Sequence, residues 1–359
     1  LQGKEPHDYD VASDATPDEV IQMFRGHREY KILEIGKAFG VIKILTPQGG
    51  EYEVATFRKD ESAGRRPDSV SFTTIDQDVQ RRDLTINALF YDILKKEVVD
   101  YVGGIADIEN NVVRTVGDPK ERFDEDRLRI LRALRFAGRL GSKLDPATDA
   151  AIKADNSLHG VSGERIRDEF LKGITSSKSV VYFLSMVSEY DLWPQIFPGL
   201  KVNEQFTDTK SIPVQLALLL RDNDPRLIAS QLNKLRYSTT EVSRVSFLVA
   251  FQGLIPENAV KLKKLLKNSS NHLPLGELIS FSKLSGKPSQ DLVRAFLAYA
   301  EKPNVSGDEV MAAGFKGADL GKEMNRRETE LFQGHLREST SLDFVSELIH
   351  EIIKQELHG

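Results

Sequence analysis

The chain has 359 residues, which exceeds the usual size of a single hydrophobic core and predicts two or more domains. Its formal net charge of −5 provides no global attraction for nucleic acid, so any site for a polyanion has to be local. The absence of cysteine excludes disulfides and thiolate zinc sites, and it predicts a cytoplasmic protein. No apolar run approaches transmembrane length, so no membrane partner is expected, and the sequence carries no signal for an oligomeric state.

The first predicted element is a strand within 6-PHDYDVASDAT-16, in which Asp8 and Asp10 are one residue apart. Strands disfavour aspartate, and alternate residues of a strand point to the same face. Two carboxylates so close repel each other unless a cation lies between them, and oxygen ligands favour Mg²⁺. The alternative is a turn or strand end with solvated aspartates, and the pair alone does not decide between the two.

The next segments predict a helix and a β-meander. Thr16 can cap a helix that begins at Pro17. Alternating, β-rich segments separated by glycine-containing turns predict three strands, at 29–35, 40–46 and 51–57. The charged segment 58–70 is expected to form a loop without regular structure. Glu53 in the last strand could lie beside the two aspartates and give three oxygen donors for one or two metal ions, which suits phosphoryl transfer. Its alternative is an exposed strand carboxylate.

The segment 81-RRDLTINALFYDI-93 begins with a charged cluster and continues as an apolar element. Arg82 could bind phosphate or ribose, and Asp83 could orient it. The alternative is an ordinary element entrance with surface charges.

From about residue 119 the pattern is helical almost to the end, so the sequence predicts an α+β protein: a small α/β domain followed by a long all-α region. The predicted helices are 119–140, 146–154, 163–174, 179–189, 213–221, 225–235, 239–253, 257–267, 287–300, 306–313, 318–332 and 341–357. The basic helix that carries Lys261, Lys263, Lys264 and Lys267 is interpreted as a solvated face, and contact with a nucleic-acid backbone is the alternative.

The segment 125-EDRLRILRALRFAGRL-140 is the most informative of these helices. Asp126, Arg129 and Arg132 follow at i, i+3 and i+6 on its polar side, and Arg135 continues the row at the edge of the apolar stripe. The arginines outnumber the nearby acids, so they are expected to be available for an anion. An Asp/Arg pair can accept cytosine or adenine, which present an amine beside a ring nitrogen acceptor, and reject uracil and guanine. The alternative is an intrahelical ion pair.

In this order, the motifs resemble those of class II CCA-adding tRNA nucleotidyltransferases and bacterial poly(A) polymerases. The matching segments are HDYDVAS, EVATFR, RRPDSVSF with RRDLTINALFYD, DYVGGIADI, EDRLRILRALRF and GERIRDEFLK. The resemblance implies a polymerase-β-like nucleotidyltransferase head followed by all-α parts. The implied domains are a head at 1–115, a neck at 116–176 that recognises the base, a body at 177–285 and a tRNA-binding tail at 286–359.

The resemblance also implies an activity: transfer of CMP and AMP from CTP and ATP to the tRNA 3′ end. It places Mg²⁺ on Asp8 and Asp10, with Glu53 as a third carboxylate. The implied nucleotide-binding residues are Arg82, Asp126, Arg129, Arg132 and Arg135. Gly103 and Asp107 belong to a motif thought to act as a hinge between head and neck.

One departure from the family pattern concerns the first motif. The family ordinarily has a Gly-Gly pair and an Arg-Asp pair before it, and the sequence from Leu1 does not include them; because the later motifs are intact, we expect truncation rather than degeneration. The segments 36-GKAFGVIKI-44 and 305-VSGDEVMAAGFKGADLGKEM-324 favour the CCA-adding type. A poly(A) polymerase, a specialised CC- or A-adding enzyme, and a non-catalytic tRNA-binding relative or inactive fragment remain alternatives.

Overall fold

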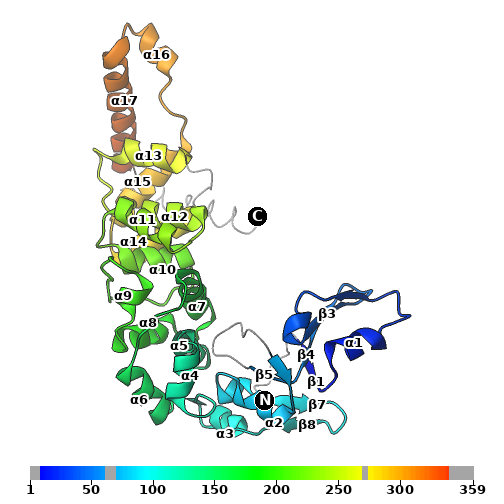
Figure 1. The fold of residues 1–359 in the computed structure, drawn as a ribbon. Helices are drawn as coiled ribbons and strands as arrows, with labels where there is room; N and C mark the ends of the chain where they lie inside the picture. The colour runs from blue at the N-terminus through cyan, green and yellow to red at the C-terminus, as the bar shows by residue number, and fades with distance from the viewer. Residues whose placement is uncertain (1–8, 61–69, 269–273, 339–359) are drawn as a thin grey trace. The chain divides into compact units, whose positions relative to one another are not determined.

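The computed structural model describes residues 9–60, 70–268 and 274–338 (Figure 1). The chain forms two compact units, Leu1–Val161 and Ser162–Gly359. The first holds the sheets and the second is helical, which confirms the predicted α+β class. The boundary between the units falls inside the predicted neck, so the division into four parts stays a prediction.

The strands of the first unit form a four-stranded sheet and three two-stranded ones. In chain order they are β1 (Asp10–Ser13), β2 (Lys31–Leu33), β3 (Val41–Leu45), β4 (Glu51–Thr56), β5 (Arg58–Asp60), β6 (Val70–Phe72), β7 (Phe90–Asp92), β8 (Glu97–Val99), β9 (Val112–Val113) and β10 (Lys143–Leu144). The larger sheet has the order β1-β4-β3-β2. The predicted meander supplies β2, β3 and β4 as antiparallel neighbours, whereas β1 joins β4 in parallel.

The first helix, α1 (Pro17–Met23), begins where the sequence predicts. The Thr16 hydroxyl accepts from the Glu19 backbone N–H at 3.4 Å, and the Glu19 carboxylate accepts from the Thr16 N–H at 2.7 Å. This reciprocal capping box satisfies N–H groups that the first turn leaves without partners. Val20 then packs on Ile42 and Ile44 of β3, which fixes the helix on the sheet.

The prediction of an irregular loop at 58–70 is wrong at both ends. Arg58 to Asp60 pair with Val70 to Phe72 as the antiparallel strands β5 and β6. The reason is that strand pairing uses backbone groups, which a high density of charged side chains does not remove. The centre of this predicted loop, residues 61–69, lies outside the described residues.

The helices of the first unit connect these strands and complete its core. After α1 they are the 3-10 turn η1 (Lys37–Phe39), α2 (Ile75–Gln80), the 3-10 turn η2 (Thr85–Asn87), α3 (Gly104–Glu109), α4 (Pro119–Glu125), α5 (Leu128–Leu140) and α6 (Pro146–Ala154). The prediction of one continuous helix at 119–140 is wrong, because Asp126 is extended, with φ −154° and ψ 102°. Its carboxylate accepts from the Leu128 N–H at 3.2 Å and so helps to start a new helix.

The second unit consists of helices (Figure 1). Their buried faces form aromatic and aliphatic cores. The helices are α7 (Gly163–Ser176), α8 (Val180–Glu189), α9 (Trp193–Ile196), α10 (Ile212–Leu220), α11 (Pro225–Lys234), α12 (Thr239–Phe251), α13 (Ala259–Asn268), α14 (Leu275–Ser285), α15 (Gln290–Glu301), α16 (Gly307–Ala312) and α17 (Gly317–Glu338). Most match predicted helices, but α9 and α14 were not predicted. The predicted helix at 341–357 lies outside the described residues.

The interpretation of α13 as a solvated basic face is wrong for Lys263, whose residue is only 1% exposed. Its ammonium lies 3.4 Å from Glu328 Oε2 on α17 and 4.0 Å from the centre of the Tyr299 ring on α15. The Tyr299 hydroxyl donates to the same carboxylate at 2.7 Å. These contacts tie three helices together, and they could form because a buried ammonium is tolerated when it is paired.

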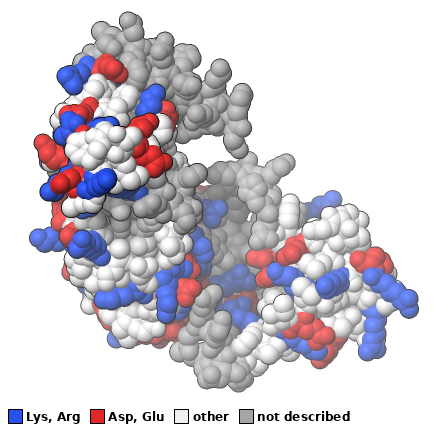
Figure 2. All heavy atoms as spheres, turned by 90° about the horizontal axis from the view of Figure 1, so that it is seen from above, with Lys and Arg blue, Asp and Glu red and all other residues white. Residues whose placement is uncertain are grey.

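Within the described part of the chain, no helix is long and apolar enough to cross a membrane. Lys and Arg side chains are interspersed with Asp and Glu over the surface seen in Figure 2, as the near balance of charges in the composition leads one to expect.

Candidate functional site

The structure brings two of the three predicted metal-binding carboxylates together. Asp10 on β1 and Glu53 on β4 are register partners in neighbouring parallel strands, so both side chains leave the same face of the sheet. Both residues are exposed. Asp8 lies outside the described residues, and among the residues that are described no group of three or more His, Cys, Asp or Glu is suited to a metal ion. Asp10 and Glu53 thus present two solvated carboxylates side by side, and such oxygen donors fit a hard divalent cation.

A lysine from the next strand balances part of this negative charge. Lys43 on β3 is the other register partner of Glu53, and its ammonium lies 3.5 Å from Glu53 and 3.2 Å from Glu51. The hydrogen bond to Glu51, followed by the attraction of both carboxylates, raises the pKa of Lys43. The sheet therefore presents Glu53 between an aspartate on one side and a lysine on the other.

The second predicted element of the site, Arg82, is held by a different acid from the one expected. Asp78 on α2 is buried, and its two carboxylate oxygens accept from Arg81 at 2.8 Å and from Arg82 at 3.2 Å. The Arg82 guanidinium also lies over the ring of Phe90, 4.5 Å from its centre. The expectation that Asp83 orients Arg82 is wrong, because Asp83 pairs with Arg132 instead.

The Asp83–Arg132 ion pair joins two of the sequence motifs. Arg132 Nε donates to Asp83 Oδ2 at 2.7 Å, and Nη2 lies 2.6 Å from the same oxygen. The other carboxylate oxygen of Asp83 accepts from the Leu84 N–H at 2.8 Å, which fixes the acid in place. Arg132 is therefore oriented by a residue 49 positions away in the sequence.

Arg129 is also held by several acceptors. It forms an i,i+4 ion pair with Glu125, and its guanidinium donates to the carbonyls of Arg122 and Arg81, each at 3.1 Å. The expectation that these arginines lie without acidic partners is thus wrong for Arg129 and Arg132. The acid that pairs with Arg129 is Glu125 at the end of α4, so this ion pair joins two helices and differs from the intrahelical pair given as the alternative. The contact with the Arg81 carbonyl places the start of the RRD segment against α5.

The last two predicted residues of this group differ in their surroundings. Asp126 occupies the junction between α4 and α5 and is partly exposed. Arg135 is 8% exposed, and its guanidinium lies 4.1 Å from the centre of the Phe136 ring. Arg135 therefore belongs to the packed side of α5, so it does not continue an exposed row of arginines.

The motif 100-DYVGGIADI-108 forms a tight turn into α3. The Asp100 carboxylate accepts from four backbone N–H groups, those of Val102, Gly103, Gly104 and Ile105, at 2.9 to 3.1 Å. Burial alone would raise the pKa of Asp100, but these N–H groups outweigh it and the pKa is lowered. A Cβ on Gly104 would lie 2.3 Å from the Thr85 carbonyl oxygen, so only glycine fits this close approach.

The predicted hinge residue Asp107 belongs to a buried polar network. It accepts from the Thr85 hydroxyl at 2.6 Å and from Arg114 Nε at 3.1 Å. Arg114 also pairs with Asp145, the residue that caps α6, so a single guanidinium connects α3 to α6. Asp78, Asp100 and Arg114 were not among the residues selected from the sequence. Asp78 had a local signal, because it stands three and four positions before Arg81 and Arg82, and Asp100 is the first residue of the motif DYVGGIADI.

Comparison with known proteins agrees with the resemblance of the motifs. The family "Poly A polymerase head domain" matches residues 1–114, and "Probable RNA and SrmB-binding site of polymerase A" matches residues 141–203. The chain is 32% identical to a CCA-adding enzyme of Lactobacillus helveticus over 349 residues, which is 91% of this chain and 84% of that one. It is 33% identical to poly(A) polymerase I of Escherichia coli O157:H7 over 245 residues, 63% of this chain and 50% of that one.

Solved structures show the same fold. The CCA-adding enzyme of Bacillus stearothermophilus in complex with CTP superposes with a TM-score of 0.66 at 24% identity, over 92% of this chain and 85% of that one. The Thermotoga maritima enzyme complexed with tRNA gives a TM-score of 0.65 at 17% identity, over 94% and 87%. The ordered motifs, the fold and the extended similarity lead to one conclusion. The chain belongs to the family of CCA-adding tRNA nucleotidyltransferases and bacterial poly(A) polymerases.

Proposed function

We propose that this protein adds CMP and AMP, taken from CTP and ATP, to the 3′ hydroxyl of tRNA without a nucleic-acid template. The observation that carries the proposal is the alignment with a CCA-adding enzyme over 84% of that enzyme's length. A poly(A) polymerase is the second candidate, favoured by a similarity that spans half of such an enzyme. A CC-adding or A-adding activity, and RNA binding without catalysis, are the remaining candidates, and the products of a tRNA extension assay distinguish them. We also propose a cytoplasmic location.

The acid pair on the sheet is proposed as the catalytic centre. Nucleotidyltransferases of this family normally use divalent metal ions. Asp10 and Glu53, together with Asp8, would hold Mg²⁺, because the two described carboxylates share one face of the sheet. When bound, the metal would lower the charge on the phosphates and activate the attacking hydroxyl. Lys43 would balance the negative charge of Glu53 until the site is filled.

The arginine cluster is proposed as the nucleotide site. Asp126 and Arg129 would read the Watson–Crick edge of the base, and the acceptors that hold Arg129 limit the directions in which its guanidinium can point. Arg82 and Arg132 would bind the ribose and phosphates, each oriented by a carboxylate. Arg135 would support this surface from the packed side of α5. The head at 1–115, neck at 116–176, body at 177–285 and tail at 286–359 remain the proposed division of labour.

One assay distinguishes the candidate functions. A tRNA transcript that ends at the discriminator base is incubated with Mg²⁺ and CTP, ATP or both, and the products are sequenced. Addition of CCA with both nucleotides supports the proposal. Long A tails with ATP alone would instead identify a poly(A) polymerase, and tRNA binding without incorporation would identify a non-catalytic relative.

Two variants test the assigned residues in the same assay. Asp10→Ala should lower incorporation by about a thousandfold or more and leave tRNA affinity unchanged, because the carboxylate would hold the metal ion needed for the reaction and takes no part in binding tRNA. Asp14→Ala, in the exposed segment after β1, is the matched control. Arg129→Ala should let UMP compete with CMP and AMP. Normal activity of Asp10→Ala, or unchanged selectivity of Arg129→Ala, would refute the respective assignment.

A further inference from the structure

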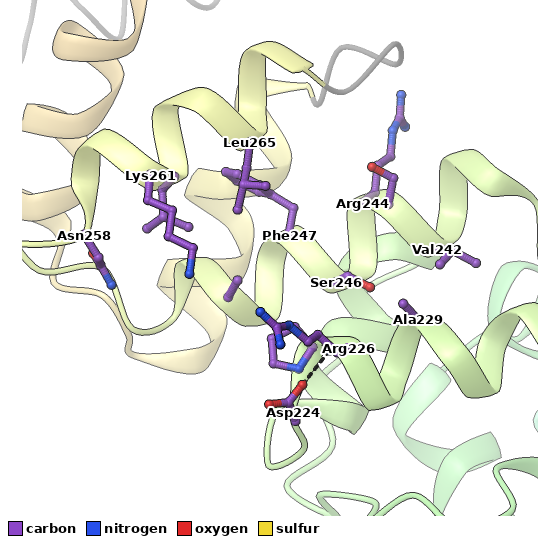
Figure 3. A pocket seen from close by; sticks show the side chains of 14 residues that line it. Asp224, Arg226, Ala229, Val242, Arg244, Ser246, Phe247, Asn258, Lys261 and Leu265 are labelled. Carbon is purple, nitrogen blue, oxygen red and sulfur yellow. Dashed lines mark hydrogen bonds between the residues drawn. The ribbon is translucent and has the colours of Figure 1, made fainter. Parts of the chain in front are cut away.

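A concave site lies in the helical unit, among α11, α12 and α13 (Figure 3). The cavity has a volume of about 620 Å³, within the range of sites that hold small organic groups. Its apolar lining residues are Pro225, Ala229, Val242, Phe247, Ala250, Leu262 and Leu265. The motifs that define the proposed nucleotide site do not include any of these residues. We call this cavity the α11–α13 pocket.

Three of the four charged residues that line the α11–α13 pocket are basic. Arg226 comes from α11 and Lys261 from α13, so two different helices bring cations to one pocket (Figure 3). Among the residues that the structure describes, Arg226 and Lys261 form no ion pair with an acidic side chain. The nearby Asp224 carboxylate caps α11 by accepting from the Arg226 backbone N–H at 2.7 Å. The remaining basic residue, Arg244, is paired with Glu277 at 3.3 Å.

The pocket also contains a buried hydroxyl and an aromatic ring. Ser246 Oγ is buried and has no hydrogen-bond partner in the described part of the protein. A buried polar atom without a partner is unfavourable, and a bound group with a donor or acceptor would remove that cost. The Phe247 ring, stacked on Phe251 with 6.0 Å between ring centres, forms an apolar wall. Cations, a hydroxyl and an aromatic wall together suit a ligand that is planar, polar at its edges and anionic.

We propose that the α11–α13 pocket receives one unpaired nucleotide of the RNA substrate. The base would pack against Phe247 and Leu265, Ser246 would hydrogen-bond the base edge or the 2′ hydroxyl, and Arg226 and Lys261 would bind the flanking phosphates. This inference rests on the proposed function only in taking RNA as the polymer. It adds a contact outside the nucleotide site, and charge complementarity favours it because a protein with a net charge of −5 needs local cations to hold a polyanion.

The test measures RNA affinity directly and does not depend on catalysis. The full chain is titrated by fluorescence anisotropy with a labelled unstructured 12-nucleotide RNA and with a labelled tRNA transcript, at several KCl concentrations. Arg226→Ala and Lys261→Ala should each weaken binding about fivefold and lower the slope of log affinity against log salt by about 0.7, the value for one phosphate contact on a single strand. Lys234→Ala, an exposed cation at the other end of α11, should have no effect.

A second pair of variants separates insertion of a base from a simple charge contact. Ser243→Trp fills the pocket and keeps both cations, so it should weaken binding at least as much as either charge variant. Ser246→Ala leaves the shape unchanged and should weaken binding about threefold, and it serves as the independent test if the tryptophan variant does not fold. The proposal requires Ser246→Ala to weaken binding while the temperature of thermal unfolding does not fall.

The contradicting outcomes are distinct from failure of the proposed function. If the parent chain adds CCA to tRNA and all pocket variants bind RNA like the parent, the pocket proposal is overturned and the function stands. If the pocket variants weaken binding of CMP as much as binding of the 12-nucleotide RNA, the ligand of the pocket is a free nucleotide and the proposal is likewise overturned. An acidic, leucine-rich peptide is titrated in the same way as an alternative ligand. If the pocket variants lose affinity for this peptide and not for RNA, the pocket proposal is overturned. If the parent chain binds neither the 12-nucleotide RNA nor the tRNA transcript, both the pocket proposal and the proposed function are overturned.

Discussion

Two clusters of charged side chains in this molecule use the same chemical groups at very different depths. In the first unit, Arg132 and Asp83 form an ion pair in which the side chains are 33% and 12% exposed. In the second, Lys263 and Glu328 form a pair in which the side chains are 1% and 6% exposed. Both pairs join segments that are far apart in the sequence, yet their surroundings give them different consequences.

The two pairs differ in whether the cation still has N–H donors that a ligand can reach. Arg132 uses Nε and Nη2 for Asp83, and a guanidinium carries five N–H donors, so the ion pair occupies only part of its binding capacity. Lys263 is enclosed by Glu328 and the Tyr299 ring. Burial, followed by the hydrogen bond to Glu328, raises the pKa of Tyr299 and keeps its hydroxyl protonated as a donor. The partly exposed Arg132–Asp83 pair suits ligand binding, whereas the buried Lys263–Glu328 pair suits helix packing.

The largest effect should come from breaking the buried pair. Glu328→Gln would leave the Lys263 ammonium without its counter-charge, and removal of one partner of a buried pair typically lowers the free energy of unfolding by about 3–5 kcal/mol. Urea unfolding followed by circular dichroism measures this. Glu330→Gln, which breaks an exposed pair with Arg326 on the same helix, should cost less than about 0.5 kcal/mol. Equal losses in the free energy of unfolding for Glu328→Gln and Glu330→Gln would contradict the difference proposed between buried and exposed ion pairs.

Breaking the partly exposed Arg132–Asp83 pair should affect nucleotide binding more than folding. Asp83→Asn removes the charge that orients Arg132, and we expect the KM for CTP and ATP to rise about tenfold, equivalent to about 1.4 kcal/mol. The loss of folding free energy should stay below about 1 kcal/mol. The control is Asp76→Asn on the exposed side of α2. Unchanged KM values together with a large loss of stability would show that the pair serves packing only.

The smallest effect should come from a carboxylate that is stabilised by backbone groups without a cation. The pKa of Asp100 is lowered from its ordinary value of 3.8, so the fold favours the ionised form. This contribution is present above that ordinary value and is lost as the pH falls through the folded-state pKa. Asp100→Asn should therefore cost about 1 kcal/mol at pH 7, and less as the pH falls below 3.8.

Urea unfolding of this variant at pH 7, 5 and 3 measures the dependence. Glu109→Gln, at the other end of α3, is the control and should show no comparable change with pH. A difference between Asp100→Asn and the parent chain that is constant from pH 7 to pH 3 would contradict the assigned role of the carboxylate.

The parts of the fold that follow from local rules could be predicted from the sequence. Thr16, Pro17 and Glu19 lie within four positions and define the start of α1, and alternation of apolar residues defines β3 and β4. The break at Asp126 could not be predicted in this way. Phe123 before the break stands seven positions from Ile130 and so continues the apolar stripe of α5 at helical spacing, which makes periodicity alone give one long helix.

The candidate site was predictable in its residue types but not in its pairings. The motifs identified Arg82, Arg129 and Arg132, yet the acids that hold two of them were misjudged because the sequence shows spacing and not direction. Asp83 stands next to Arg82 in the chain and contacts Arg132. Similarly, Lys263 reads as a surface lysine because its partner follows 65 residues later.

The parallel register of β1 and β4 limits where the chain can accept inserted residues during evolution. Glu53 lies in the strand between β1 and β3, so one inserted residue within β4 would turn its carboxylate to the opposite face of the sheet. Insertions in the turn between β3 and β4 carry no such penalty, because the strands on either side keep their alignment. Length variation among descendants should therefore accumulate in that turn and spare the strand beside Asp10.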